Sequence, residues 1–205
     1  MKKLIVIVAS LLVAVSAHAQ LGVIAGITSS KSDFGSAIAD VKSKNITQYH
    51  VGLTYKASLG LIAIQPSLIY NMKGTELDVT DLAATKLDMK TGFIELPVQV
   101  QLGFNLGIAR IYGFAEPFIG YAITNTGSLG GTALKDLKWE NIKNRLEYGV
   151  GLGTGIELIK HVQVSVKYFW NLGDLYGSDI TFAGVTKTIA SSKASGIAAS
   201  VAILF

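Results

Sequence analysis

The stretch that decides the fold runs from residue 161 to residue 170 and reads HVQVSVKYFW. Its apolar residues stand at every second position from Val162 to Trp170, and His161, Gln163, Ser165 and Lys167 stand between them. Successive side chains of a β-strand point to opposite sides, whereas a helix needs apolar residues three and four positions apart. The stretch therefore predicts a strand with one apolar and one polar face.

The same alternation recurs about eight times along the chain. It is clear in residues 49–56, 94–102 and 196–205, and weaker in 21–28, 61–72, 110–123 and 145–158. Short turns are expected near Leu59-Gly60, Asn105-Gly107 and Ile159-Lys160. Connections of about 15 to 20 residues are expected at 30–45, 73–88, 124–144 and 173–192, and this alternation of short turns with long loops is typical of outer-membrane barrels.

The amino-terminal residues indicate an exported protein. Lys2 and Lys3 precede an apolar run from Leu4 to Val15 and the small-residue motif Ala17-His18-Ala19, which is the pattern of a cleaved signal peptide. We expect a signal peptide over residues 1–19 and one barrel domain over residues 20–205. Without the signal, 18 − 2 = 16 basic residues face 14 acidic ones, which is too balanced for a nucleic-acid partner.

The composition excludes some classes of site and leaves the direction of the faces open. The 205 residues contain no cysteine, so disulfides and thiolate metal sites are excluded. The hydrophobic share is 50%, and a soluble lipocalin-like barrel would place that apolar face inside. Small residues at Gly149, Gly151, Gly153 and Gly155 instead suit the packed interior of a narrow barrel. An aromatic girdle at the outward strand ends is expected from Tyr49, Tyr70, Tyr121, Tyr148, Tyr168 and Trp170.

These features predict an all-β fold, an eight-stranded antiparallel up-and-down transmembrane β-barrel in the bacterial outer membrane, after a cleaved signal peptide. Parity along the strands then predicts a charge network in the lumen. Its members would be Lys56, Glu95, Arg110, Glu116, Arg145, Glu147, Glu157 and Lys167. Buried charges need partners, so we expect ion pairs that fill the lumen. Alternatively, these pairs could rearrange and open a narrow path for ions. Phe93, Phe114 and Phe118 also face inward, where their bulk suggests slips of register.

No catalytic residue, cofactor site or metal site is expected. Only His50 and His161 remain after the signal, and both are predicted to face the lumen. His161 and Ser165 would stand about 13 Å apart along one strand, too far for a hydrogen bond. Gly149 to Gly155 alternate strictly and do not match a phosphate-binding loop.

Several short motifs, in this order and spacing, resemble one known family, the small outer-membrane β-barrel proteins of Bacteroidetes-type bacteria that are called porin-family or PorT-like. They are Ile94-Glu95-Leu96-Pro97, Pro117-Phe118-Ile119-Gly120-Tyr121, Glu147-Tyr148-Gly149, Gly153-Thr154-Gly155-Ile156-Glu157, Lys167-Tyr168, Asn171-Leu172-Gly173-Asp174 and Phe205. The family usually has Arg where Lys167 stands. The resemblance implies an eight-stranded barrel inserted by the barrel-assembly machinery, which reads the last strand and its terminal aromatic, here Phe205. It implies no activity, because members include a secretion accessory protein and barrels without known roles.

The expected function is a non-enzymatic barrel that anchors long extracellular loops. Its expected partners are outer-membrane lipid, lipopolysaccharide and a surface or envelope protein. Three alternatives remain at this point: a narrow porin-like channel with a charge-lined lumen, an accessory protein of a secretion system, and a soluble periplasmic lipocalin-like binder.

Overall fold

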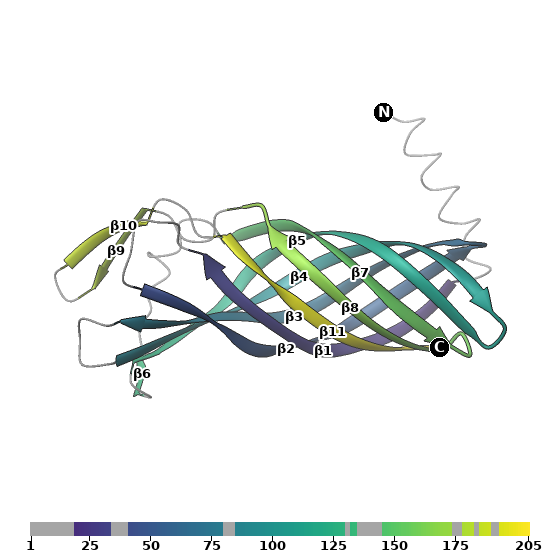
Figure 1. Cartoon of the computed structure of the whole chain (residues 1–205), viewed down its shortest axis with the longest axis horizontal. Coiled ribbons are helices and arrows are strands. Elements are labelled where there is room, and N and C mark those ends of the chain that lie inside the picture. The colour runs from purple at the N-terminus through teal and green to yellow at the C-terminus, as the bar shows by residue number, and fades with distance from the viewer. Residues whose placement is uncertain are drawn as a thin grey trace, which may run out of the picture.

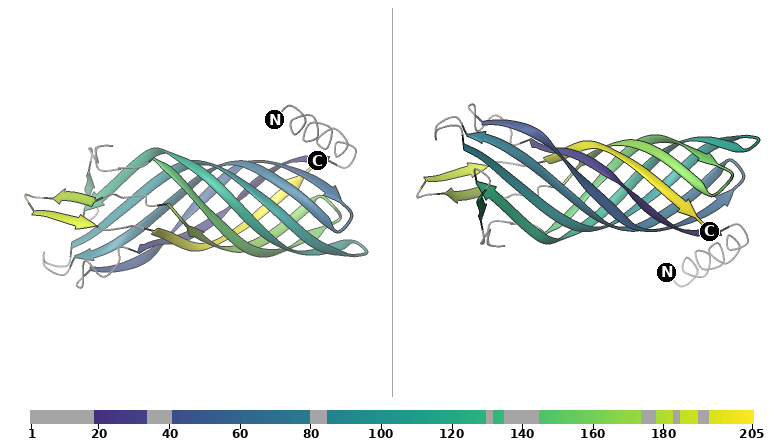
Figure 2. Two further views of the ribbon diagram at one scale, coloured as in Figure 1. Left: turned by 90° about the horizontal axis from the view of Figure 1, so that it is seen from above. Right: turned by 90° about the horizontal axis from the view of Figure 1, so that it is seen from below.

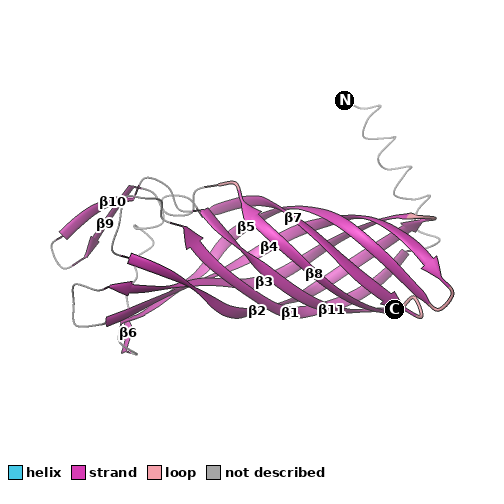
Figure 3. Cartoon of the chain, in the orientation of Figure 1, coloured by secondary structure: helices cyan, strands magenta, loops and turns pink. Residues whose placement is uncertain are grey.

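A computed structural model describes residues 19–33, 41–79, 85–129, 132–134, 145–173, 178–182, 185–189 and 193–205, and all regular structure in them is β (Figures 1 and 3). The predicted signal lies outside the described residues except for Ala19, which begins the first strand. The strands are β1 (Ala19–Asp33), β2 (Val41–Leu59), β3 (Ile62–Val79), β4 (Thr85–Leu106), β5 (Ala109–Leu129), β6 (Thr132–Leu134), β7 (Leu146–Leu158), β8 (Val162–Asn171), β9 (Ser178–Phe182), β10 (Val185–Ile189) and β11 (Lys193–Leu204).

Eight of these strands close into a barrel. The sheet runs β4-β3-β2-β1-β11-β8-β7-β5, every neighbouring pair is antiparallel, and pairing of β4 with β5 joins the two ends. Strand β6 adds only to β5, and β9 pairs with β10. Both views in Figure 2 show one closed cylinder. The predicted eight-stranded antiparallel barrel is confirmed, and closure leaves the barrel without an exposed sheet edge.

The apolar faces of the strands point out of the barrel. Leu21, Leu53 and Val164 expose 58%, 55% and 45% of their surface, whereas His50 and Glu95, on the opposite faces, expose 3% and 2%. A soluble lipocalin-like barrel would need the reverse arrangement, so that alternative is wrong. No helix among the described residues is long and apolar enough to span a membrane.

Bulky inward residues of β5 fit because glycines of β7 lie opposite them. Tyr112 pairs with Gly155, Phe114 with Gly153, and Phe118 with Gly149. A Cβ on these glycines would lie within 2.5 Å of the facing ring atoms, closer than van der Waals contact allows. The aromatic residues therefore do not mark slips of β5 against β7. The register does shift beside Phe93, between β4 and β5, and again in β2 between Asn45 and His50.

The two ends of the barrel differ. At one end the chain turns tightly through Gly60-Leu61, Gly107-Ile108 and residues 159–161, and Gly60 and Gly107 adopt positive φ angles of 64° and 71°. At the other end the expectation of long loops needs correction, because the strands continue through much of the predicted connections, as β3 does to Val79. The alternation continues there, since Leu77 and Val79 alternate with Glu76 and Asp78 on β3, and Leu87 and Met89 alternate with Lys86 and Asp88 on β4.

Candidate functional site

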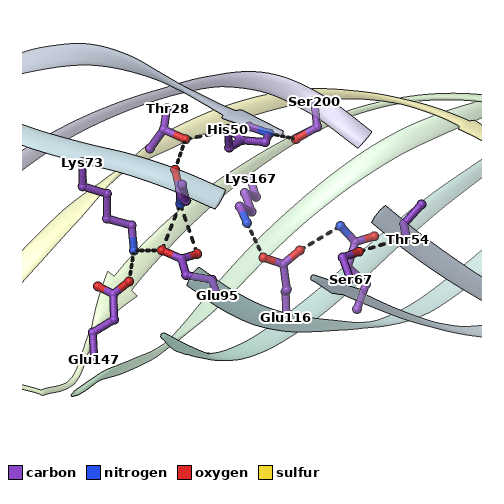
Figure 4. Close-up of polar contacts among 12 residues, drawn as sticks. Thr28, His50, Thr54, Ser67, Lys73, Glu95, Glu116, Glu147, Lys167 and Ser200 are labelled. Carbon is purple, nitrogen blue, oxygen red and sulfur yellow. Dashed lines mark hydrogen bonds and ion pairs between the residues drawn. The ribbon is translucent and has the colours of Figure 1, made fainter. Parts of the chain in front are cut away.

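Polar side chains in the lumen form two groups, one toward each end of the barrel. The first group, here called the loop-side belt, lies toward the long connections. Figure 4 shows most of it beside part of the second group. The eight residues of the belt come from seven of the eight barrel strands. In contact order they are Ser200, His50, Thr28, Asn71, Glu95, Lys73, Glu147 and Asn171.

Hydrogen bonds link the first half of the belt. His50 lies between two hydroxyls, with Nε2 2.9 Å from Ser200 Oγ and Nδ1 2.9 Å from Thr28 Oγ1. Thr28 donates to Asn71 Oδ1 over 3.0 Å, and Asn71 Nδ2 donates to both carboxylate oxygens of Glu95 over 3.0 and 3.1 Å. The belt thus joins β11, β1, β2, β3 and β4, which are consecutive neighbours in the sheet.

Lys73 occupies the centre of the second half. Its Nζ lies 2.7 Å from Glu95 Oε1 and 3.0 Å from Glu147 Oε1. It also lies over three rings, 5.4 Å from the centroid of Phe93, 4.7 Å from that of Phe118 and 4.9 Å from that of Phe169. Lys73 exposes only 4% of its surface, so the ammonium group is stabilised by carboxylates and ring faces in place of water.

The second group, here called the turn-side network, fills the half of the lumen nearer the short turns. Its members are Thr54, Lys56, Gln65, Ser67, Gln99, Gln101, Arg110, Glu116, Glu157, Gln163 and Lys167. Gln101 is its hub, since it donates to Gln65 over 2.8 Å and to Gln99 over 2.9 Å and accepts from Arg110 over 2.8 Å.

One carboxylate in this network serves two cations. Glu157 pairs with Lys56, and its Oε2 lies 3.9 Å from Arg110 Nη1. Gln163 also donates to Glu157 Oε2 over 2.8 Å. Glu116 instead pairs with a single cation, Lys167, and accepts from Gln99 over 2.8 Å.

Apolar and glycine positions separate the two groups along individual strands. On β2, Gly52 lies between His50 and Thr54, and on β3 Ile69 lies between Ser67 and Asn71. Ile69 packs with Ile24 and Ala202 in a small buried cluster. The lumen of a barrel with about eight strands is just wide enough for side chains, and here the side chains of both groups are buried, except that Lys167 is partly exposed.

The structure brings most of the predicted lumen charges together. Lys56 contacts Glu157, Lys167 contacts Glu116, and Glu95 and Glu147 share Lys73. Arg110 is buried beside Glu157 and Gln101. Arg145 lies immediately before β7, is half-buried, and its carbonyl accepts the Ala122 N–H over 2.8 Å.

Lys73 was not among the predicted lumen charges, because it was assigned to the start of a long loop. The prediction also left out the amides of Asn71, Gln65, Gln163 and Asn171, which link the charges. The signal for Lys73 was present in the parity of β3: Ala63, Gln65, Ser67, Ile69, Asn71 and Lys73 are all buried at every second position.

His161 does not face the lumen as predicted. It is exposed in the turn before β8, where its Nδ1 lies 2.7 Å from the carbonyl oxygen of Ile159. The positive φ angles of Ile159 and Lys160, 47° and 62°, show that the chain is still turning at this point. His161 therefore lies before the strand to which its parity was assigned.

The outward aromatics lie near the loop-side ends of β7 and β8, but well inside β2, β3 and β5, whose strands continue beyond them. Tyr49 and Tyr70 are neighbours with ring centroids 6.1 Å apart, and Tyr168 and Trp170 are 4.7 Å apart. Tyr121 and Tyr148 are exposed, as is Phe205 at the other end of the barrel, whose N–H donates to the Leu21 carbonyl over 2.7 Å. A girdle at the membrane interface and an insertion signal at Phe205 stay predictions.

The contact between Ser200 and His50 does not make a hydrolytic site. The other ring nitrogen of His50 meets the neutral hydroxyl of Thr28, whereas a catalytic triad places a carboxylate there to stabilise the imidazolium. All three side chains are buried, with exposures of 9%, 3% and 0%. Among the described residues no group of three His, Cys, Asp or Glu is arranged to hold a metal ion.

A comparison with protein families identifies the family of this barrel. Residues 15–177 match the model of the outer membrane protein beta-barrel domain. The chain belongs to this family. It is therefore a protein of the bacterial outer membrane, and the outward apolar face is its lipid-facing surface. The narrower resemblance to PorT-like proteins stays a prediction.

Solved structures of small outer-membrane barrels resemble this chain at low sequence identity. The outer membrane protein OprG of Pseudomonas aeruginosa is 13% identical with a TM-score of 0.50, and the match covers 91% of this chain and 94% of that one. Neisserial surface protein A is 12% identical with a TM-score of 0.44, covering 90% and 97%. Ail of Yersinia pestis is 13% identical with a TM-score of 0.40, covering 91% and 98%. No curated protein sequence matches. At these identities the likeness concerns the fold alone.

Proposed function

We propose that this protein is a non-enzymatic anchor whose sealed barrel holds extended strands above the membrane for contact with lipopolysaccharide or with a surface or envelope protein. The short turns face the periplasm in this arrangement, as in other outer-membrane barrels. The export signal over residues 1–19 and insertion by the assembly machinery are parts of the same proposal.

The length of the β3–β4 hairpin is the observation that carries it. The two strands stay paired from Ile62 opposite Leu102 to Val79 opposite Thr85. The outward aromatic of β3 nearest this end is Tyr70, and the nine further residues to Val79 span roughly 30 Å of strand. Figure 1 shows these strand ends projecting beyond the closed part of the barrel.

Charged residues at paired positions of β2, β3 and β4 also bear on the projecting strands. Lys42 is opposite Asp78, which is opposite Lys86, and Lys44 is opposite Glu76. Glu76 is also opposite Asp88, which has the same charge. Opposite charges at directly paired positions favour a sheet, by about 0.2–1 kcal/mol for each pair. In the proposed arrangement the three opposite-charge pairs favour continued pairing of the projecting strands, and the Glu76–Asp88 pair opposes it.

Removal of this hairpin end tests the proposal. Gly74 and Lys90 are directly opposite in the register, so replacement of residues 75–89 by Asn-Gly gives a two-residue hairpin turn of a favoured type. The shortened barrel should keep its heat-dependent gel shift and its insertion, and should fail to restore adhesion and envelope integrity to a strain that lacks the protein.

A matched control changes the other end of the barrel. Replacement of Gly60-Leu61 by Asn-Gly alters the two-residue turn between β2 and β3 without touching the projecting strands. This variant should restore the strain fully. Full restoration by the shortened hairpin as well would refute the anchor proposal.

A second candidate, a narrow channel, is favoured by the charges that line the lumen at several levels. Planar-bilayer recordings of the folded protein test it. The anchor proposal expects silent recordings from the wild type, because the two polar groups fill the lumen. A steady conductance whose ion selectivity reverses when Glu95 or Lys167 is replaced would instead establish that the protein is a channel.

A further inference from the structure

The surroundings of Lys73 are those of a ligand site. Five groups from four strands converge on its ammonium: Glu95 and Phe93 from β4, Phe118 from β5, Glu147 from β7 and Phe169 from β8. One carboxylate would suffice to pair a buried lysine, as Glu116 does for Lys167. Three ring faces around one cation are instead the arrangement by which proteins recognise alkylammonium groups.

The chemistry of the lining indicates which cation it takes. Small metal ions such as Mg²⁺ and Ca²⁺ need six or more oxygen ligands, whereas this lining offers two carboxylates and three apolar rings. A primary ammonium on a short alkyl arm satisfies both parts, since its N–H groups donate to the carboxylates and its carbon atoms contact the rings. The lining therefore matches an organic ammonium ion.

A second, independent observation lies beside Glu147. Asn171 is 2% exposed, and its Nδ2 donates to Glu147 Oε2 over 2.7 Å. Among the residues that the structure describes, its buried Oδ1 has no hydrogen-bond partner. Buried polar atoms are nearly always paired, so this oxygen has an unfilled place for a donor next to the carboxylate that binds the ammonium.

We propose that Glu95, Glu147, Phe93, Phe118 and Phe169 form an ammonium-binding cage, that Lys73 is its tethered ligand, and that the vacated cage binds a free primary alkylammonium ion. The cage lies at the loop-side end of the lumen. Ser30 Oγ donates to the carbonyl of Gly74, the residue that follows Lys73. This inference does not depend on the anchor proposal, because a silent barrel and a conducting one can both contain the cage.

The test replaces the tethered ligand by a free one. Lys73→Ala keeps Cβ and removes the three carbons and the nitrogen of n-propylammonium. We expect the variant, refolded in detergent, to lose its heat-dependent gel shift at a lower temperature than the wild type. Titration with n-propylammonium chloride should raise that temperature along a saturating curve, with half-saturation in the millimolar range, while equal NaCl should not.

Lys167→Ala is the matched control, because it creates the same propylammonium-shaped deletion at a lysine that has one carboxylate and no ring contact among the described side chains. Its midpoint should respond to n-propylammonium no more than to NaCl. The wild type should need at least a ~10-fold higher concentration, because free ligand must displace a tethered one. Phe118→Leu in the Lys73→Ala background should raise the half-saturating concentration several-fold.

Three outcomes would overturn the proposal: a shift no larger than that with NaCl, an equal shift in Lys167→Ala, or a half-saturating concentration unchanged by Phe118→Leu. If Lys73→Ala does not fold alone, refolding is repeated with n-propylammonium present. A folded fraction that rises along a saturating curve supports the cage, and a fraction no higher than with NaCl refutes it.

Discussion

The loop-side belt and the turn-side network solve the same problem with opposite charge ratios. In the belt one cation, Lys73, stands between two carboxylates, Glu95 and Glu147. In the network one carboxylate, Glu157, stands between two cations, Lys56 and Arg110. Lys73 in the belt lies over three rings, whereas Arg110 in the network lies over one, that of Tyr112, at 5.2 Å. Side-chain amides donate to the carboxylates of both groups. The difference teaches that a narrow lumen can hold either one cation between two carboxylates or one carboxylate between two cations, when neighbouring rings and amides contact the charged groups.

The largest expected effect is at Lys73. Lys73→Met removes the only cation that the structure shows on Glu95 and Glu147, so two buried carboxylates lose their shared partner. We expect the free energy of unfolding in guanidinium to fall by about 3–5 kcal/mol. Lys167→Met, which unpairs the single carboxylate of Glu116, is the control. An equal or larger loss in the control would contradict the special place of Lys73.

The turn-side network should tolerate loss of its shared ion better. Glu157→Gln leaves Lys56 without a carboxylate, but Arg110 keeps the Gln101 oxygen at 2.8 Å and the Leu61 carbonyl at 3.3 Å. We therefore expect a loss of about 2–3 kcal/mol, measured by the same unfolding curves. A loss above that of Lys73→Met would reverse the comparison.

A glycine of β7 allows the tightness of packing in the lumen to be compared with that on the lipid-facing side. In Gly153→Ala the new Cβ would lie 2.5 Å from Phe114 Cζ and 2.4 Å from the Val166 carbonyl oxygen. We expect a loss of about 1–3 kcal/mol from overpacking. Its partner in the control is Gly113→Ala on the exposed face, where the nearest atom lies at 3.8 Å, and stability there should be nearly unchanged. Similar losses in both variants would contradict the packing argument.

The smallest expected effects come from the loss of one hydrogen bond in each group. Ser200→Ala leaves His50 Nε2 without its hydroxyl partner, and we expect a loss of about 1–2 kcal/mol. Ser67→Ala removes a donor to Thr54, which still accepts from Gln65 over 3.0 Å, so the loss should stay below about 1 kcal/mol. Equal losses in the unfolding curves would show that His50 finds another partner.

Much of this architecture follows from local sequence. Period-two alternation predicted the strands and their faces, and the inward parity of Glu95, Arg110, Glu157 and their neighbours followed from it. Parity says which side of a strand a residue occupies, because that depends only on the strand's own geometry. It failed at His161, which lies in a turn. It was not extended to Lys73, which was assigned to a long loop although it shares the inward parity of Gln65 and Asn71.

The sequence by itself therefore determined the class of fold, the face of each strand that contacts lipid, and whether an inward charge is positive or negative. Which charge meets which was decided only by the closed barrel, since the partners of Lys73 lie on β4 and β7 and their separation across the lumen depends on strand number and register. The fit of Phe114 against Gly153 is of the same kind. A strand sets the direction of its side chains alone, but a contact across a lumen requires all the strands that surround it.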